Sequence, residues 1–154
     1  MNESPAFVRE IMAFCGLDLI QFHGEESPEV CKAFMPRAIK AFRVRDGSVL
    51  PLIRPYKGSI RAVLLDTFSH ERHGGTGQTF DWDIAVTAKE MRIPVILSGG
   101  LNPFNIRDAI WKASPFAVDV NSGIEKRPGK KDPDLMTEFM GRIKALGRGR
   151  APNE

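Results

Sequence analysis

The chain has 154 residues, a net charge of +3 and 42% hydrophobic residues, values typical of one globular domain. No apolar run approaches the ~18 residues of a membrane span and no signal-peptide pattern opens the chain, so we expect a cytoplasmic protein that contacts no membrane. The mild charge argues against nucleic-acid binding. We expect one domain over residues 1–146 and a flexible basic tail over 147–154.

The first predicted element is a helix that begins at Ser4-Pro5 and ends before Gly16. Serine can accept hydrogen bonds from the free backbone N–H groups of a helix start, and proline is tolerated at the first helical position. Glycine is a common C-terminal stop. Apolar residues at helical spacing predict the buried face of this helix. They are Phe7, Val8, Ile11, Met12 and Cys15.

Strands and helices alternate along the rest of the chain. Short apolar runs predict strands over 19–22, 38–44, 61–66, 93–97 and 116–120. Amphipathic stretches predict helices over 28–35, 83–91, 103–113 and 133–146. Segment 46–58 is ambiguous, because prolines interrupt an apolar pattern that would suit a short helix. This alternation predicts an α/β protein whose parallel sheet is covered by helices, but periodicity leaves open whether the sheet is open or closed.

Polar residues gather at the carboxyl ends of the predicted strands, where parallel α/β proteins carry out their chemistry. They are Gln21, His23, Lys40, Arg43, Asp66, Ser98, Asp119 and Asn121. Asp66 ends an apolar run and leads into a glycine-rich loop over 73–79, closed by Phe80 and Trp82, which we expect to pack the loop against the next helix. By itself, Asp66 suits proton transfer and turn capping equally. Period-two alternation would let Asp66 and Asp119 face the same interior.

Two shorter glycine loops follow the last two predicted strands. Ser98-Gly99-Gly100 precedes an expected capped helix start at Asn102-Pro103, and Asn121-Ser122-Gly123 follows the final strand. Glycine lets backbone N–H groups approach an anion closely, and paired loops of this kind are a recurrent phosphate site in barrels. The presence of two such loops favours phosphate binding over the alternative that the glycines only form turns.

For several residues a structural role is the preferred interpretation. His23 suits a loop cap better than a substrate contact, and Lys40 is expected to be solvated although it lies in an apolar strand. Cys15 and Cys31 lie on predicted helix faces and are expected to be core thiols. Two cysteines suggest neither a disulfide framework nor a zinc site. No metal site is predicted.

Six motifs of this chain, in the same order, resemble those of phosphoribosylanthranilate isomerase, an enzyme of tryptophan biosynthesis. They are QFHGE at 21–25, KAFRV at 40–44, LDT at 65–67, GGTGQTFDW at 74–82, LSGGLNP at 97–103 and VDVNSGIE at 118–125. The resemblance continues through 128–132 and covers nearly the whole chain. The glycine-rich loop and the LSGGLNP motif are its most specific parts.

The resemblance implies an Amadori rearrangement of N-(5-phosphoribosyl)anthranilate to 1-(2-carboxyphenylamino)-1-deoxyribulose 5-phosphate. A general acid protonates the furanose ring oxygen, the ring opens to a Schiff base, and a general base removes the C2′ proton. The resemblance implies that Asp66 is the acid and that His23 and Asp119 line the substrate pocket. The phosphate-binding residues that it implies are Gly99, Gly100, Ser122 and Gly123. The reaction needs neither a metal nor an organic cofactor.

The start of the chain departs from the family pattern. The family is a TIM (β/α)₈ barrel, and this chain resembles about five of its parallel strands, family strands 4–8, so we expect a partial barrel. The family's first strand carries a Lys-Ile-Cys-Gly motif whose cysteine is the general base, and its second strand carries an arginine that binds the anthranilate end; both would precede Met1. Phe14-Cys15-Gly16 is no substitute, because Cys15 ends a predicted helix at the face opposite Asp66.

Two functions stay open at this point. The first is an isomerase of a small sugar phosphate, with little or no activity as this chain alone and with self-association through exposed sheet edges. The alternative is a non-catalytic phosphate-ligand-binding or assembly fragment that needs a complementing N-terminal segment. An upstream in-frame Lys-Ile-Cys-Gly segment would support the first, and a stop codon there the second. Indole-glycerol-phosphate synthase, a third option, is disfavoured by the glycine-rich loop after Asp66.

Overall fold

The computed structural model of the chain describes residues 1–67 and 79–148. Its central feature is a parallel sheet of five strands in the order β1-β2-β3-β4-β5. The strands are β1 Ile20–Phe22, β2 Ala38–Val44, β3 Ala62–Thr67, β4 Val95–Leu97 and β5 Ala117–Val118. The predicted α/β class and parallel sheet are therefore confirmed. The prediction of a strand over 116–120 was too long, because only two residues pair with β4 and Phe116 is exposed.

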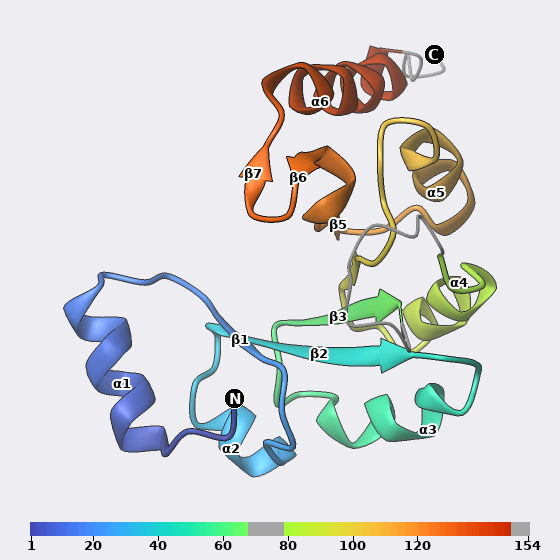
Figure 1. Cartoon of the computed structure of the whole chain (residues 1–154). Helices are drawn as coiled ribbons and strands as arrows, with labels where there is room; N and C mark the ends of the chain where they lie inside the picture. The colour runs from blue at the N-terminus through green and yellow to red at the C-terminus, as the bar shows by residue number, and fades with distance from the viewer. Residues whose placement is uncertain (68–78, 149–154) are drawn as a thin grey trace.

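Helices follow the outer side of the curved sheet (Figure 1), and α2 to α5 connect its successive strands. They are α1 Pro5–Phe14, α2 Pro28–Lys32, α3 Val49–Ile53, α4 Asp83–Lys89, α5 Ile106–Ala113 and α6 Pro133–Arg148. The ambiguous segment 46–58 forms α3 and the 3₁₀ helix η1 (Arg54–Tyr56). Pro51 of α3 and Pro55 of η1 are compatible with these helices. Each lies within the first turn, where a backbone N–H has no intrahelical partner to lose.

The core lies between the sheet and the helices that cover it. Val63 and Leu65 of β3 and Leu97 of β4 are fully buried on the helix-facing side. Small residues at helical spacing let α4 and α5 approach the sheet closely. Fully buried examples are Ala85, Ala88, Ala109 and Ala113. The described residues contain no helix long and apolar enough to cross a membrane.

The first helix confirms the predicted ends but not the predicted buried face. The Ser4 hydroxyl accepts a hydrogen bond from the Phe7 backbone N–H at 3.2 Å, and Gly16 follows the helix with a φ of +63°. Only Val8 and Met12 are buried, whereas the other three residues of the apolar stripe are at least partly exposed. The α1 helix therefore buries two of the five residues of its apolar stripe against the described part of the chain.

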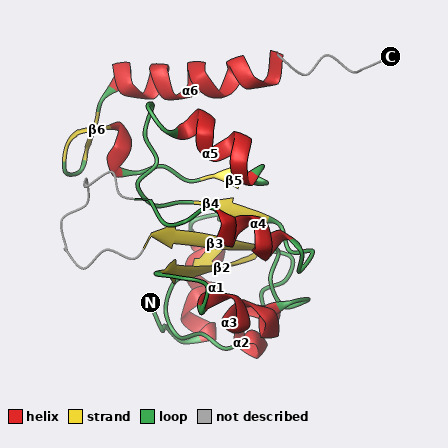
Figure 2. Ribbon diagram, turned by 90° about the vertical axis from the view of Figure 1, so that its right-hand side faces the viewer, coloured by secondary structure: helices red, strands yellow, loops and turns green. Residues whose placement is uncertain are grey.

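The C-terminal region contains an antiparallel hairpin that was not predicted, seen beside α6 in Figure 2. It pairs β6 Glu125–Arg127 with β7 Lys130–Lys131. The intervening Pro128-Gly129 is a turn signal, but the strands are charged and lack the apolar alternation that would have identified them. Helix α6 continues to Arg148, two residues into the predicted tail. The remaining tail residues, 149–154, lie outside the described residues.

Candidate functional site

The site is built on one row of residues at the carboxyl ends of β2 to β5. Arg43 is the register partner of Asp66, and Leu65 pairs with Leu97, which in turn pairs with Val118. In each of β3, β4 and β5 the residue after this pair is polar. Asp66, Ser98 and Asp119 therefore lie next to one another in one row. Neighbouring residues in one row of a parallel sheet point to the same face. The predicted clustering of Asp66 with Asp119 is consistent with this register.

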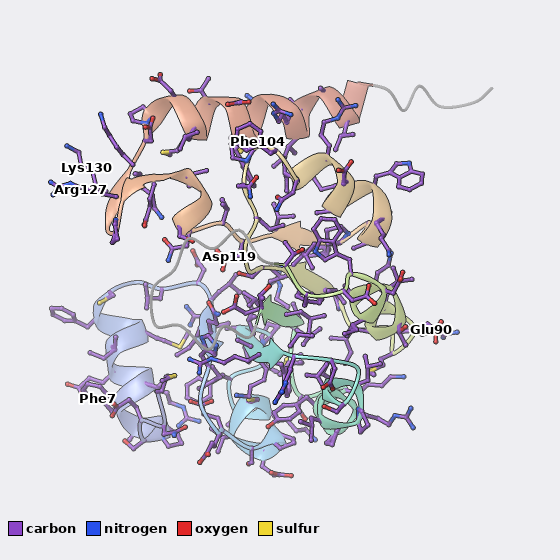
Figure 3. All side chains as sticks on the ribbon, turned by 45° about the vertical axis from the view of Figure 1, so that its right-hand side comes forward. Phe7, Glu90, Phe104, Asp119, Arg127 and Lys130 are labelled. Carbon is purple, nitrogen blue, oxygen red and sulfur yellow. The ribbon has the colours of Figure 1, made fainter. Side chains whose placement is uncertain are left out.

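Backbone and side-chain hydrogen bonds hold this row in place. The Ser98 backbone N–H donates to the Leu65 carbonyl at 2.8 Å, and the Asp119 N–H donates to the Leu97 carbonyl at 2.8 Å. The Ser98 hydroxyl donates to Oδ2 of Asp119 at 3.1 Å. Ser98 is buried whereas Asp119 is exposed, so the hydroxyl restrains a carboxylate that is otherwise open to solvent. Figure 3 shows Asp119 between the C-terminal hairpin and the N-terminal half of the molecule.

Asp66 is half-buried, and its surroundings favour the protonated form. Burial is the largest influence and raises the pKa of the Asp66 carboxyl above its ordinary value. His23, the Thr67 backbone N–H and Arg43 lower this pKa, and Asp119 adds to the rise. A carboxyl with a raised pKa holds its proton closer to neutral pH, which suits a general acid.

His23 lies directly after β1, and the strand register places it on the same face of the sheet as Asp66. Its Nε2 is buried and has no hydrogen-bond partner among the described residues. The sequence favoured a loop-capping role for His23. A capping nitrogen should have a hydrogen-bond partner, so the environment of Nε2 does not support that role. A buried nitrogen without a partner in the described part of the chain is a candidate for contact with a ligand.

The two short glycine loops meet at a cavity of about 230 Å³. It is lined by Gly100, Asn102, Pro103, Phe104, Ser122, Gly123 and Leu135. Three of the four residues predicted to bind phosphate are in this lining, and the fourth, Gly99, precedes Gly100. No hydrogen bond within the described part of the chain uses the backbone N–H of any of these four residues. Such N–H groups around a cavity can bind an anion.

Close packing explains why glycine is required in these loops. A Cβ on Gly123 would lie 1.8 Å from the Leu101 carbonyl oxygen, so the two loops touch through backbone. Gly99 has a φ of +82°, and a Cβ there would lie 2.2 Å from the Thr67 backbone nitrogen. The loop after β4 is thus packed against the end of β3, next to Asp66.

The predicted helix start at Asn102-Pro103 was wrong, since α5 begins at Ile106. The Asn102 side chain instead accepts hydrogen bonds from the Phe104 and Asn105 backbone N–H groups, forming a turn before the helix. The side-chain amides of Asn102 and Asn105 both donate to the Gly100 carbonyl, at 3.1 and 2.9 Å. These bonds fix the carbonyl of Gly100, while its N–H has no partner among the described residues.

Two further expectations were wrong. Lys40 is 2% exposed rather than solvated, and it forms an ion pair with Glu26 at 3.0 Å. Cys15 is exposed rather than in the core, whereas Cys31 is buried as expected, and burial raises the pKa of its thiol to about 11. A lysine inside an apolar strand was the available signal for the buried pair, but nothing in the sequence identified Glu26 as its partner.

The glycine-rich loop that follows Asp66 lies largely outside the described residues, which resume at Thr79. Phe80 is buried, as expected, and its backbone N–H donates to the Thr67 hydroxyl at 3.3 Å. Trp82 is half-buried just before α4. Among the described residues no cluster of three or more histidine, cysteine or acidic side chains is arranged to hold a metal ion.

Comparison with known proteins decides the family. The model of the family described as N-(5′-phosphoribosyl)anthranilate (PRA) isomerase matches residues 1–142. The chain belongs to the PRA isomerase family. Membership agrees with the resemblance of the six sequence motifs and with the parallel α/β sheet.

Individual relatives of the PRA isomerase family support the assignment. The N-(5′-phosphoribosyl)anthranilate isomerase of Geobacter metallireducens is 50% identical over 145 residues, which are 94% of this chain and 70% of that protein. The crystal structure of the Thermotoga maritima phosphoribosyl anthranilate isomerase has a TM-score of 0.84 and 38% identity, covering 95% of this chain and 71% of that one. A further solved PRA isomerase, at TM-score 0.79 and 36% identity over 94% of this chain and 69% of its own, is a complex with reduced 1-(o-carboxyphenylamino)-1-deoxyribulose 5-phosphate.

Proposed function

We propose that this chain carries the isomerase function of its family, with Asp66 as the general acid of ring opening. The observation that carries the proposal is a half-buried carboxyl of raised pKa at the carboxyl end of β3, in a chain 50% identical to a named PRA isomerase. The substrate class is a small phosphosugar, in keeping with the ligand of the solved family complex.

In the proposed reaction, Asp66 donates its proton to the furanose ring oxygen as the bond from that oxygen to C1′ breaks. The lone pair of the anthranilate nitrogen forms the Schiff base. Loss of the C2′ proton then moves electrons back toward nitrogen, and the resulting enol-amine tautomerises to the ketone. We propose that His23 and Asp119 line the pocket for the ribose, and that the N–H groups of Gly99, Gly100, Ser122 and Gly123 bind the phosphate.

A second group must accept the C2′ proton, and neither cysteine of the chain suits that task. Cys15 follows α1 and precedes β1, so it lies toward the amino ends of the strands. Asp66 lies at the opposite, carboxyl end of β3. Cys31 is buried in α2, and burial raises the pKa of its thiol to about 11, so it is protonated near neutral pH. We therefore propose that the base is not a cysteine of this chain.

The test compares the parent chain with Asp66→Asn, with and without an added segment that matches the part of the Geobacter relative outside the aligned region. Turnover of N-(5′-phosphoribosyl)anthranilate is measured by chromatography, and affinity for the reduced product analogue by calorimetry. We expect turnover with the added segment and about a 10²–10⁴-fold lower kcat for Asp66→Asn at similar affinity. Asp108→Asn, on the exposed face of α5, is the matched control and should retain turnover. Unchanged kcat in Asp66→Asn would remove Asp66 from its role.

A second candidate function is phosphate-ligand binding without turnover. It is favoured by the position of the cavity, whose lining residues all belong to the described part of this chain. Binding of the product analogue by the parent chain, with no turnover under any of the conditions above, would support this candidate over the isomerase.

A further inference from the structure

The loop after β1 rests on an ion pair that is almost completely removed from solvent. Nζ of Lys40 lies 3.0 Å from Oε2 of Glu26, and their side chains are 3% and 6% exposed. Removing two charges from water costs much of what their attraction returns, so a buried pair is weak support for stability by itself. The contacts that this pair makes with its surroundings are therefore informative about its role.

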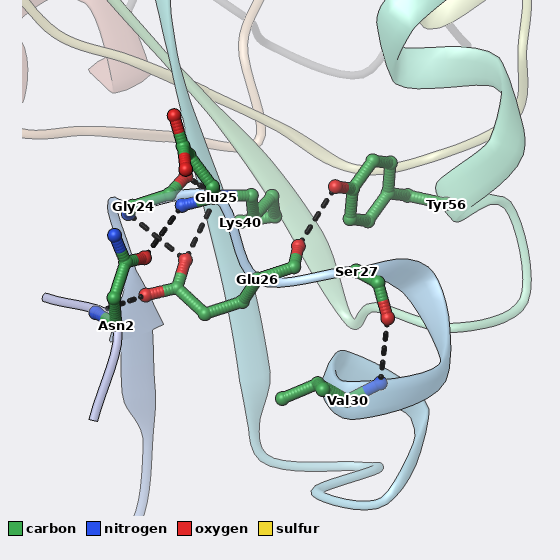
Figure 4. Close-up of polar contacts among 8 residues, drawn as sticks. All are labelled: Asn2, Gly24, Glu25, Glu26, Ser27, Val30, Lys40 and Tyr56. Carbon is green, nitrogen blue, oxygen red and sulfur yellow. Dashed lines mark hydrogen bonds and ion pairs between the residues drawn. The ribbon is translucent and has the colours of Figure 1, made fainter. Parts of the chain in front are cut away.

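Both charged groups hold the backbone of Gly24 (Figure 4). The Lys40 ammonium donates to the Gly24 carbonyl at 2.5 Å, and the Gly24 N–H donates to Oε2 of Glu26 at 2.9 Å. Each polar group of this residue thus contacts one member of the ion pair. A Cβ on Gly24 would lie 2.0 Å from Oδ1 of Asn2, so the loop cannot shift far toward the N-terminal segment.

Neighbouring residues extend the same network. The Asn2 N–H donates to Oε1 of Glu26 at 3.0 Å, and the Glu25 N–H donates to Oδ1 of Asn2 at 2.7 Å. The Tyr56 hydroxyl donates to the Glu26 carbonyl at 2.8 Å. The loop over 24–26 is consequently bound to the N-terminal segment, to β2 and to η1.

This network lies on the opposite face of the sheet from His23. Phe22 pairs with Lys40, which pairs with Val63 in the helix-covered row, so His23, one residue further, belongs to the alternate face. His23 is covalently joined to Gly24, and the register places it on the face of the sheet that also holds Asp66, whose pKa the imidazole lowers. The Gly24 peptide therefore connects the ion pair directly to His23.

We propose that Glu26 and Lys40 are positioning residues, which fix the Gly24 peptide so that the imidazole of His23 is held beside Asp66. The consequence for catalysis rests on the role proposed above for Asp66, but the positioning itself requires no turnover. It is measured on the carboxyl of Asp66, which His23, Asp119 and Arg43 influence from the neighbouring strand ends.

The decisive variant is the double substitution Glu26→Leu with Lys40→Met. It removes one charge of each sign, so the net charge is unchanged, and it replaces the pair by apolar side chains, which often preserves stability. The titration midpoint of Asp66 is followed by carbon NMR of labelled aspartate, assigned with Asp66→Asn. We expect the double variant to have a melting temperature close to that of the parent. The titration midpoint of Asp66 should lie at a higher pH, because a displaced His23 lowers the pKa of Asp66 less.

The control is Asp83→Leu with Lys112→Met, which removes an exposed ion pair of 2.8 Å between α4 and α5. It should leave the Asp66 midpoint unchanged. Inorganic phosphate should bind the parent and both double variants with equal affinity, since the glycine loops are unchanged. This measurement tests the proposed phosphate site separately from the positioning role of Glu26 and Lys40.

A folded double variant with the parent's Asp66 midpoint overturns the proposal. Should that variant not fold, Glu26→Asp keeps the charge but withdraws the carboxylate from the Gly24 and Asn2 N–H groups by one methylene. The same higher midpoint is expected there, and an unchanged midpoint in a folded Glu26→Asp protein would again refute the positioning role.

Discussion

Replacing Glu26 by Gln should remove a large, pH-dependent part of the stability of this chain. Burial opposes ionisation of Glu26, but the Asn2 N–H, Lys40 and the Gly24 N–H stabilise the carboxylate and lower its pKa from 4.5 to about 2. A carboxyl whose pKa is lowered on folding stabilises the fold above its unfolded pKa and loses this effect as pH falls toward the folded value. The shift corresponds to ~3 kcal/mol between pH 6 and pH 2.

The assay is urea unfolding followed by circular dichroism, at pH values from 7 down to 2.5. Near pH 7 the Glu26→Gln chain should be less stable than the parent by ~3 kcal/mol, with Lys40 left as an unpaired buried charge. The difference should start to narrow below about pH 4.5, since the parent then also begins to carry a neutral side chain. Glu25→Gln is the matched control, because Glu25 is exposed and only its backbone takes part in the network. A parent-to-variant difference that stays constant across this range would refute the reasoning.

Two other predictions concern the glycine loops and the cysteines. Gly123→Ala should destabilise the chain by about 1–3 kcal/mol and weaken phosphate binding measured by calorimetry, because its Cβ would clash with the Leu101 carbonyl. Gly141→Ala, in open space on α6, should be neutral or stabilising, and equal losses in both variants would contradict this view. A thiol reagent at pH 8 should modify Cys15 in the folded chain and Cys31 only in urea, since burial raises the pKa of the Cys31 thiol to about 11. Equal labelling rates in the folded state would show that the region around Cys31 opens readily.

Much of the secondary structure could be predicted because its signals act over a few residues. Ser4 and Ser27 each accept a hydrogen bond from an N–H three residues later, as a helix cap requires. The apolar run of β2 was predicted with the correct bounds, because most residues of a buried parallel strand are apolar. The charged hairpin β6–β7 lacked any such pattern and was missed.

The candidate site was predicted in part for the same reason. Asp66 and Asp119 could be recognised as residues that end apolar strands, and the glycine loops as segments suited to an anion. The burial that raises the pKa of Asp66, and the identity of the groups around it, depend on four strands lying in register. The start of α5 was misplaced because Asn102 forms its hydrogen bonds in a turn that Gly100 also joins.

The sequence by itself thus determined the α/β class, the order of its elements and the family, because caps, periodicity and motifs are written in neighbouring residues. Only the tertiary structure decided that Lys40 is buried against Glu26, that Cys15 is exposed while Cys31 is not, and that His23 leaves Nε2 without a partner among the described residues. Burial and pairing of this kind join residues distant in the chain. They depend on how strands align and how loops pack, which no local pattern specifies.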